Sequence, residues 1–117
     1  MGYIKHHAIV VTGTYGDWAA KAKAEAVKVF SGTASVTSLT GPDLNDTRSF
    51  MVAPDGSKEG WEGSDKGDAA RDRFIEYLRS QQCEDGSSPL SWAEVVLGSD
   101  DREAHVERHT WKKGKPK

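Results

Sequence analysis

Apolar residues along the chain switch between the period of a strand and the period of a helix. Continuous apolar or β-branched runs at residues 3–12 and 48–53 predict two strands, and residues 34–39 predict a weaker one. Between residues 18 and 30, apolar residues recur every three or four positions, which indicates a helix. The unbroken run in the first strand favours a central strand that is buried on both faces.

The second half of the chain again contains a segment with helical spacing of apolar residues and a segment with the spacing of a strand. Residues 68–80 predict a second amphipathic helix, and residues 90–97 predict a third firm strand. That strand has two different faces, and Trp92 and Val96 share one of them. Residues 104–109 are expected to return as a short edge strand after a turn.

This order of elements is strand, helix, strand, strand, helix, strand, with one extra strand at the end. It is typical of the split βαβ arrangement called ferredoxin-like, so we expect an α+β fold with an antiparallel sheet and both helices on one face. The opposite face then has no cover. If Trp92 and Val96 lie there, they form an apolar patch that favours a homodimer or higher homo-oligomer. A single domain is predicted at residues 3–109, followed by a basic flexible tail at residues 110–117.

Charge and cysteine content narrow the class of protein. The 117 residues include 16 basic and 18 acidic side chains, a net charge of −2, which makes nucleic acid an unexpected partner. A single cysteine, Cys83, forms no internal disulfide and favours a reducing compartment. No apolar run resembles a signal region or a membrane span. We therefore expect a cytoplasmic protein without a membrane partner.

The segment at residues 54–68 is the main candidate for a binding site. It combines glycines, charges of both signs and one tryptophan, and it leads into the start of a helix, whose free N–H groups attract anions. The segment predicts a site for a small anionic ligand. Its expected contacts are Ser57, Lys58, Ser64 and Lys66 on the anion, with Trp61 stacked on a base. The alternative is an ordered surface loop that Trp61 pins to the core.

Two better-known loops do not fit this segment. Asp55, Ser57, Glu59 and Gly60 have the spacing of the start of a calcium-binding EF-hand, but Lys66 occupies the position of its bidentate glutamate. A P-loop needs a Gly-Lys-Ser/Thr sequence that does not occur at the required spacing. We predict neither a metal nor a cofactor.

The four histidines allow further chemistry. His6 and His7 are neighbours on a strand and must point to opposite faces, so each is a separate candidate donor to the ligand. The alternative for both is a half-buried structural role. His105 and His109 would share a face of a strand, roughly 13 Å apart, without an evident third metal ligand. No catalytic constellation is readable, so no residue is assigned a catalytic role.

Aromatic residues add one more alternative. Phe50, Trp61, Trp92 and Trp111 raise the option of base stacking on an open sheet face, as in RNA-recognition motifs. The basic aromatic strands of those motifs are missing, so these residues are expected in the core or in a dimer contact.

Three segments carry a resemblance to a group of proteins. Residues 5–12 (KHHAIVVT), 49–61 (SFMVAPDGSKEGW) and 85–90 (DGSSPL) look like small proteins of bacteriophages and their bacterial hosts, over about residues 3–98. These proteins have no assigned activity. Some small phage proteins sequester the nucleotide second messengers of bacterial immunity as homo-oligomers, which implies an anti-defence role in the host cytoplasm.

The leading hypothesis is therefore a non-enzymatic homo-oligomer that sequesters a small anionic molecule such as a cyclic nucleotide. One alternative is a protein–protein interaction module that inhibits a host factor through the open sheet face and the basic tail. Another is a cyclic nucleotide phosphodiesterase that acts through His6, His7 and His105.

Overall fold

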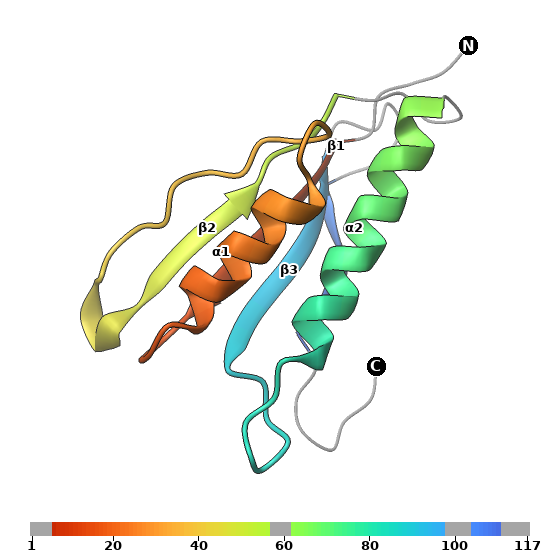
Figure 1. Cartoon of the computed structure of the whole chain (residues 1–117). Helices are drawn as coiled ribbons and strands as arrows, with labels where there is room; N and C mark the ends of the chain where they lie inside the picture. Colours follow the sequence, from red (N-terminus) through yellow and green to blue (C-terminus); the bar gives the residue numbers. More distant parts are fainter. Residues whose placement is uncertain (1–5, 57–61, 98–103, 111–117) are drawn as a thin grey trace.

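The computed structural model describes residues 6–56, 62–97 and 104–110. It contains one antiparallel sheet in the order β2-β1-β3-β4. Helices α1 and α2 lie side by side across one face of this sheet (Figure 1). The elements are β1 (His6–Gly13), α1 (Trp18–Val29), a 3-10 turn η1 (Leu44–Asp46), β2 (Arg48–Val52), α2 (Glu62–Ser80), β3 (Leu90–Leu97) and β4 (His105–His109). The predicted α+β class is confirmed as an antiparallel four-stranded sheet with two helices.

The weaker strand predicted at residues 34–39 is not a regular strand. Val36 forms a single antiparallel bridge with Val52. Nearby, the Thr37 N–H donates to Met51 O at 2.9 Å, and the Ala53 N–H donates to Ser35 O at 2.8 Å. The segment thus follows the outer edge of β2 without a continuous ladder of hydrogen bonds.

Helix α2 begins at Glu62, six residues before the predicted start. The sequence predicts a loop there because Gly63 and Gly67 are poor helix formers. Acidic residues such as Glu62 and Asp65 favour a helix N-terminus, because its free N–H groups carry partial positive charge. The loop predicted at residues 54–68 is therefore shorter, and Ser64 and Lys66 belong to the first turns of α2.

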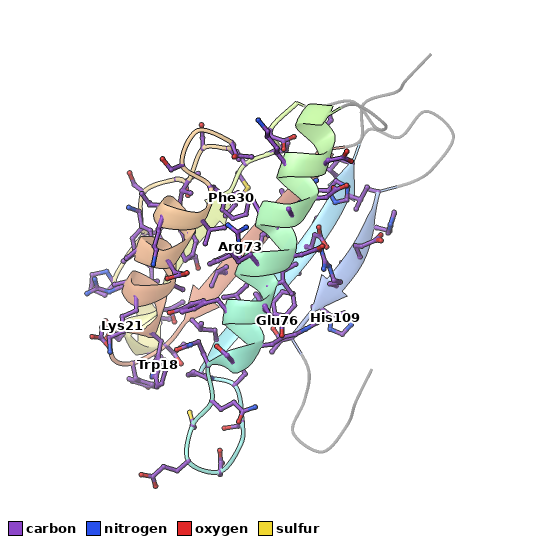
Figure 2. The ribbon with its side chains drawn as sticks, turned by 45° about the vertical axis from the view of Figure 1, so that its right-hand side comes forward. Trp18, Lys21, Phe30, Arg73, Glu76 and His109 are labelled. Atoms are coloured by element: carbon purple, nitrogen blue, oxygen red, sulfur yellow. The ribbon has the colours of Figure 1, made fainter. Side chains whose placement is uncertain are left out.

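The core lies between the two helices and the sheet. Phe74 of α2 is fully buried and meets Phe30 edge to face at 5.7 Å between ring centroids, with Phe50 of β2 at 6.4 Å. In Figure 2, Phe30 points into this layer, whereas Arg73 and Glu76 of α2 are exposed to solvent. The other buried members of the core are Ile9, Val11, Ala19, Ala22, Ala26, Val52, Ala70, Ile75, Leu78, Leu90 and Trp92.

Trp92 and Val96 therefore lie beneath the helices, and the suggestion that they form a patch on the uncovered face is wrong. Trp92 pairs with Val11 across the sheet, and Val96 pairs with His7, so all four side chains share the helix-facing side. Both residues are buried, and the Arg79 guanidinium lies 5.9 Å from the Trp92 ring centroid.

Strand β1 is central, as predicted, because it pairs with β2 on one edge and β3 on the other. It is not buried evenly on both faces. Ile9 and Val11 are fully buried beneath the helices, whereas Val10 is 40% exposed on the other face. Both helices occupy one side of the sheet, so only alternate residues of β1 enter the core.

Strand β4 completes the described sheet at its far edge. The pairing continues to Thr110, which was predicted to start the flexible tail: its N–H donates to Trp92 O at 3.0 Å. Residues 111–117 lie outside the described residues. Within the described part of the chain, no helix combines the length and apolar character that crossing a membrane requires.

Candidate functional site

Glu94 is the most unusual residue of the sheet. It lies on the helix-facing side of β3, between Trp92 and Val96, and is 0% exposed. A carboxylate in such a place is strongly destabilising unless cations and hydrogen-bond donors surround it. The position of its partners therefore shows how this part of the fold is held together.

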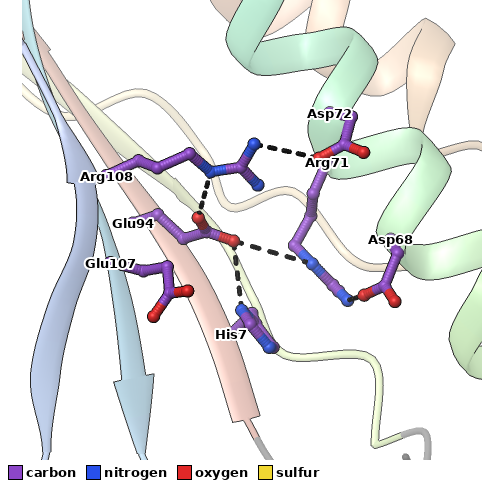
Figure 3. Close-up of a pocket in the computed structure, with 7 residues that line it drawn as sticks. All are labelled: His7, Asp68, Arg71, Asp72, Glu94, Glu107 and Arg108. Atoms are coloured by element: carbon purple, nitrogen blue, oxygen red, sulfur yellow. Dashed lines mark hydrogen bonds and ion pairs between the residues drawn. The ribbon is translucent and has the colours of Figure 1, made fainter. Parts of the chain in front are cut away.

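Three side chains from three elements surround the Glu94 carboxylate (Figure 3). Nδ1 of His7, on β1, lies 3.0 Å from Oε2. Arg108 of β4 donates from Nε to Oε1 at 2.7 Å. Arg71 of α2 places its Nε 3.8 Å from Oε2, an ion-pair distance. Glu94 thereby links the first strand, the last strand and the second helix.

A second layer of carboxylates surrounds the two arginines. Arg71 donates to Asp55 at 3.3 Å and to Asp68 at 2.5 Å. Arg108 donates to Asp72 at 2.9 Å. Each guanidinium is thus shared between buried Glu94 and at least one carboxylate nearer the surface, and the network extends to the segment that follows β2.

The network sets the charge of Glu94. Burial raises the pKa of the Glu94 carboxyl, but hydrogen bonds from His7 and Arg108, together with their charges, lower that pKa to about 2. The hydrogen bond to Glu94 also raises the pKa of Arg108 above its usual value. Glu94 is consequently a carboxylate at any pH near neutrality.

An irregularity in β4 positions Arg108. The register shifts between Glu94 and Val95, so that Glu94 pairs with Arg108 while Val95 pairs with Val106, which leaves Glu107 as an extra residue. Such a bulge changes the direction in which side chains point. It places Arg108 on the helix-facing side, where it reaches Glu94.

The same bulge separates His105 and His109, which were predicted to share a face. His105 pairs with Val96 on the helix-facing side, and His109 pairs with Ala93 on the other side. His105 lies 2.8 Å from a Glu107 oxygen. Among the described residues, no three or more side chains of the metal-binding types gather into a group.

A surface pocket of about 430 Å³ opens beside this network, between α2, β1, β3 and β4. We call it the Glu94 pocket. Its lining residues are His7, Asp68, Arg71, Asp72, Glu94, Glu107 and Arg108. The His7 side chain is 11% exposed, and its contact with Glu94 uses only Nδ1. The other ring nitrogen, Nε2, has no partner among the described residues, and whether it donates or accepts depends on the tautomer of the ring.

Of the predicted ligand-binding residues whose side chains the structure describes, His7 alone lines the Glu94 pocket. His6 lies on the opposite sheet face, as its neighbour position predicts, and its Nδ1 is buried without a hydrogen-bond partner. Lys66 is exposed on α2. Ser57, Lys58 and Trp61 lie outside the described residues, and Ser64 is described only as part of the helix.

Sequence reasoning missed Glu94, Arg71 and Arg108. One signal was present: Glu94 occupies an alternating row with Trp92 and Val96, where an apolar residue is expected. A charged residue in an apolar row requires partners of opposite charge. The sequence does not say which arginines these are, because both are distant along the chain.

Gly67 allows the close approach of α2 to Asp55. A Cβ at this position would overlap Oδ2 of Asp55 and would lie 3.2 Å from Nη1 of Arg71. We expect Gly67→Ala to lower the free energy of unfolding by about 1 kcal/mol, because the gain in helix propensity, about 1 kcal/mol, is smaller than the cost of displacing Asp55 from Arg71, about 2 kcal/mol.

Urea denaturation in two backgrounds tests this expectation. In an Asp55→Ala background the overlap is removed, so the same Gly67→Ala change should become stabilising. If it stabilises or destabilises equally in both backgrounds, the contact with Asp55 is not the reason for glycine at this position.

Comparisons with protein-family models, with curated proteins and with solved structures found no match for this chain. The resemblance to small phage proteins stays a prediction.

Proposed function

We propose that the protein binds a small ligand that is rich in hydrogen-bond donors, such as a compound with a primary ammonium or a guanidinium group, in the Glu94 pocket. The observation that carries the proposal is the state of His7. Glu94 holds one nitrogen of the ring, and the other nitrogen has no partner at the pocket. A polar ligand that donates to Nε2 supplies this partner.

The charges around the pocket support a ligand of this kind. Its lining contains four carboxylates, Asp68, Asp72, Glu94 and Glu107, and two guanidinium groups, so the formal charges of these six groups sum to −2. The guanidinium groups already donate to carboxylates within the protein. Oxygens of the exposed carboxylates are left to accept from a ligand.

Isothermal titration calorimetry with putrescine and agmatine as probes tests the proposal. His7→Asn is the informative variant, because its amide lies near the place of Nδ1 and can still donate to Glu94 while the Nε2 position is lost. We expect at least a tenfold weaker association, about 1.4 kcal/mol, for this variant. The matched control, His105→Asn, changes a histidine outside the pocket lining and should bind as the unchanged protein does.

Equal affinity of the His7→Asn variant and the unchanged protein would contradict a role for Nε2. Absence of binding by either probe at millimolar concentration would contradict the ligand class. Circular dichroism of both variants establishes that a loss of binding is not a loss of folding.

A small anionic ligand, such as a cyclic nucleotide, is a second candidate. One observation favours it: Asp72, the outer partner of Arg108, is 68% exposed, so a phosphate could replace it on the guanidinium. The predicted contacts at Ser57, Lys58 and Trp61 belong to this candidate. A panel of cyclic and linear nucleotides in the same titrations separates the two ligand classes, and Lys58→Ala should weaken only the nucleotides.

Catalysis by three histidines has less support. His6 and His7 lie on opposite faces of the sheet, so a phosphodiesterase site would have to be built from His7 and His105 without His6. Assays of cyclic nucleotide turnover by the unchanged protein and by His7→Asn distinguish this reaction from binding alone.

We also infer that the topology is ferredoxin-like when the segment along β2 is counted as a strand. A ferredoxin-like sheet places the first strand between the third and the fourth, with the second at the edge beside the third. The bridge between Val36 and Val52 supports this order, because it puts residues 34–39 beside β2, with β1 and β3 following.

A further inference from the structure

The side of the sheet that faces away from the helices has an unusual composition. We call it the open face. By the register of the strands, its described residues are His6, Ala8, Val10, Thr12, Ser49, Met51, Ser91, Ala93, Val95, Leu97, Val106 and His109. None of these is Asp, Glu, Lys or Arg, although such residues make up 29% of the chain. A solvated sheet face normally carries charges, whereas the centre of a protein interface is depleted of them.

The open face also holds large apolar side chains in contact with solvent. Val10 and Leu97 are each 40% exposed, and Val106 is 52% exposed. A shallow hollow of about 470 Å³ lies on this face, with Val10, Ala93 and His109 in its lining. Figure 2 shows His109 on the edge strand, away from the helices. Apolar projections beside a hollow are the features by which two surfaces interlock.

We propose that the open face is the surface through which two copies of this chain associate, face to face. An uncharged surface is complementary to itself, because a two-fold contact brings no like charges together. A strongly charged partner would find no Asp, Glu, Lys or Arg side chain to pair with among the described residues of this face. The sheets would stack about 10 Å apart, as the two layers of a β-sandwich do.

The size of the face indicates how strong this contact is. Four strands about 4.8 Å apart and about 20 Å long cover on the order of 400 Å² in each copy, or about 800 Å² in total. Side chains project from the sheet and enlarge this area. The enlarged area reaches only the lower end of the range for specific interfaces. The expected dimer is therefore weak and dependent on concentration, as small transient interfaces are.

Sedimentation velocity of the full chain from about 1 µM to about 1 mM tests the proposal. Val106→Glu places two like charges into the contact, one from each copy, and should raise the dissociation constant at least about tenfold. Val10→Glu should act in the same way at the centre of the face. The matched control is Val27→Glu, because Val27 is also an exposed valine but lies on α1.

A chain that remains a monomer over the whole range overturns the proposal, and so does a Val106→Glu variant that dimerises as the unchanged protein does. The latter result would mean that any dimer uses another surface. Circular dichroism reports whether each variant folds. If Val10→Glu does not fold, Val106→Glu still tests the proposal, because Val106 is on an edge strand. The outcome is independent of the Glu94 pocket, because ligand titrations of the monomeric variant test that pocket separately.

Discussion

Replacing Glu94 by glutamine should lower the free energy of unfolding by about 3 kcal/mol at neutral pH. Glutamine has nearly the same size, and its carbonyl can accept one of the hydrogen bonds, but it carries no charge. Two guanidinium groups would then lack their shared buried counter-charge, a situation that typically costs about 3–5 kcal/mol. Arg108 is partly exposed, and solvent screening places the expected value at the lower end of this range.

Urea denaturation followed by circular dichroism measures this difference, with Glu107→Gln as the matched control. Glu107 lines the same pocket, but its side chain is exposed and pairs with His105, so its replacement should cost less than about 1 kcal/mol. Equal costs for the two variants would mean that desolvation of the buried charges cancels their attraction.

Acid should remove the same contribution from the unchanged protein. The ordinary pKa of a glutamate is 4.5, and in the folded protein the pKa of Glu94 is lowered to about 2. A lowered pKa stabilises the fold above the unfolded value, and the stabilisation is lost as the pH falls from about 4.5 toward about 2. A difference of this size corresponds to about 3 kcal/mol.

Comparison with Glu94→Gln isolates this effect from that of other carboxylates. Urea denaturation of both proteins between pH 7 and about pH 2 should give curves of stability that converge as the pH falls, because protonated glutamic acid and glutamine are both uncharged. Parallel curves across this range would show that Glu94 does not titrate between its unfolded and folded pKa values.

The periods of apolar residues predict the main strands and the first helix well, because burial against one shared core determines these elements. Helix α1 was predicted at residues 18–30, and it spans Trp18–Val29. The start of α2 was missed because helix propensity treats Gly67 as a defect. In the structure the missing side chain makes room for Asp55. Propensity describes the isolated helix, whereas this glycine serves a contact between distant segments.

The candidate site was less predictable than the fold. His7 was identified as a candidate because a histidine is a versatile hydrogen-bonding group, and the structure places it in the Glu94 pocket. Arg108 reaches this pocket only because of the bulge at Glu107, and regular alternation does not reveal an inserted residue. The pairs Arg71–Glu94 and Arg108–Glu94 join positions that only the tertiary fold brings together.

The bulge in β4 has a second consequence, for colloidal behaviour. Among the described strands β4 is the last of the sheet, and a flat terminal strand invites further strands to add without limit. The inserted Glu107 interrupts the even spacing of donors and acceptors and adds a negative charge where such growth would begin. We expect this edge to resist the addition of further strands and so to oppose open-ended growth of the sheet into fibrils.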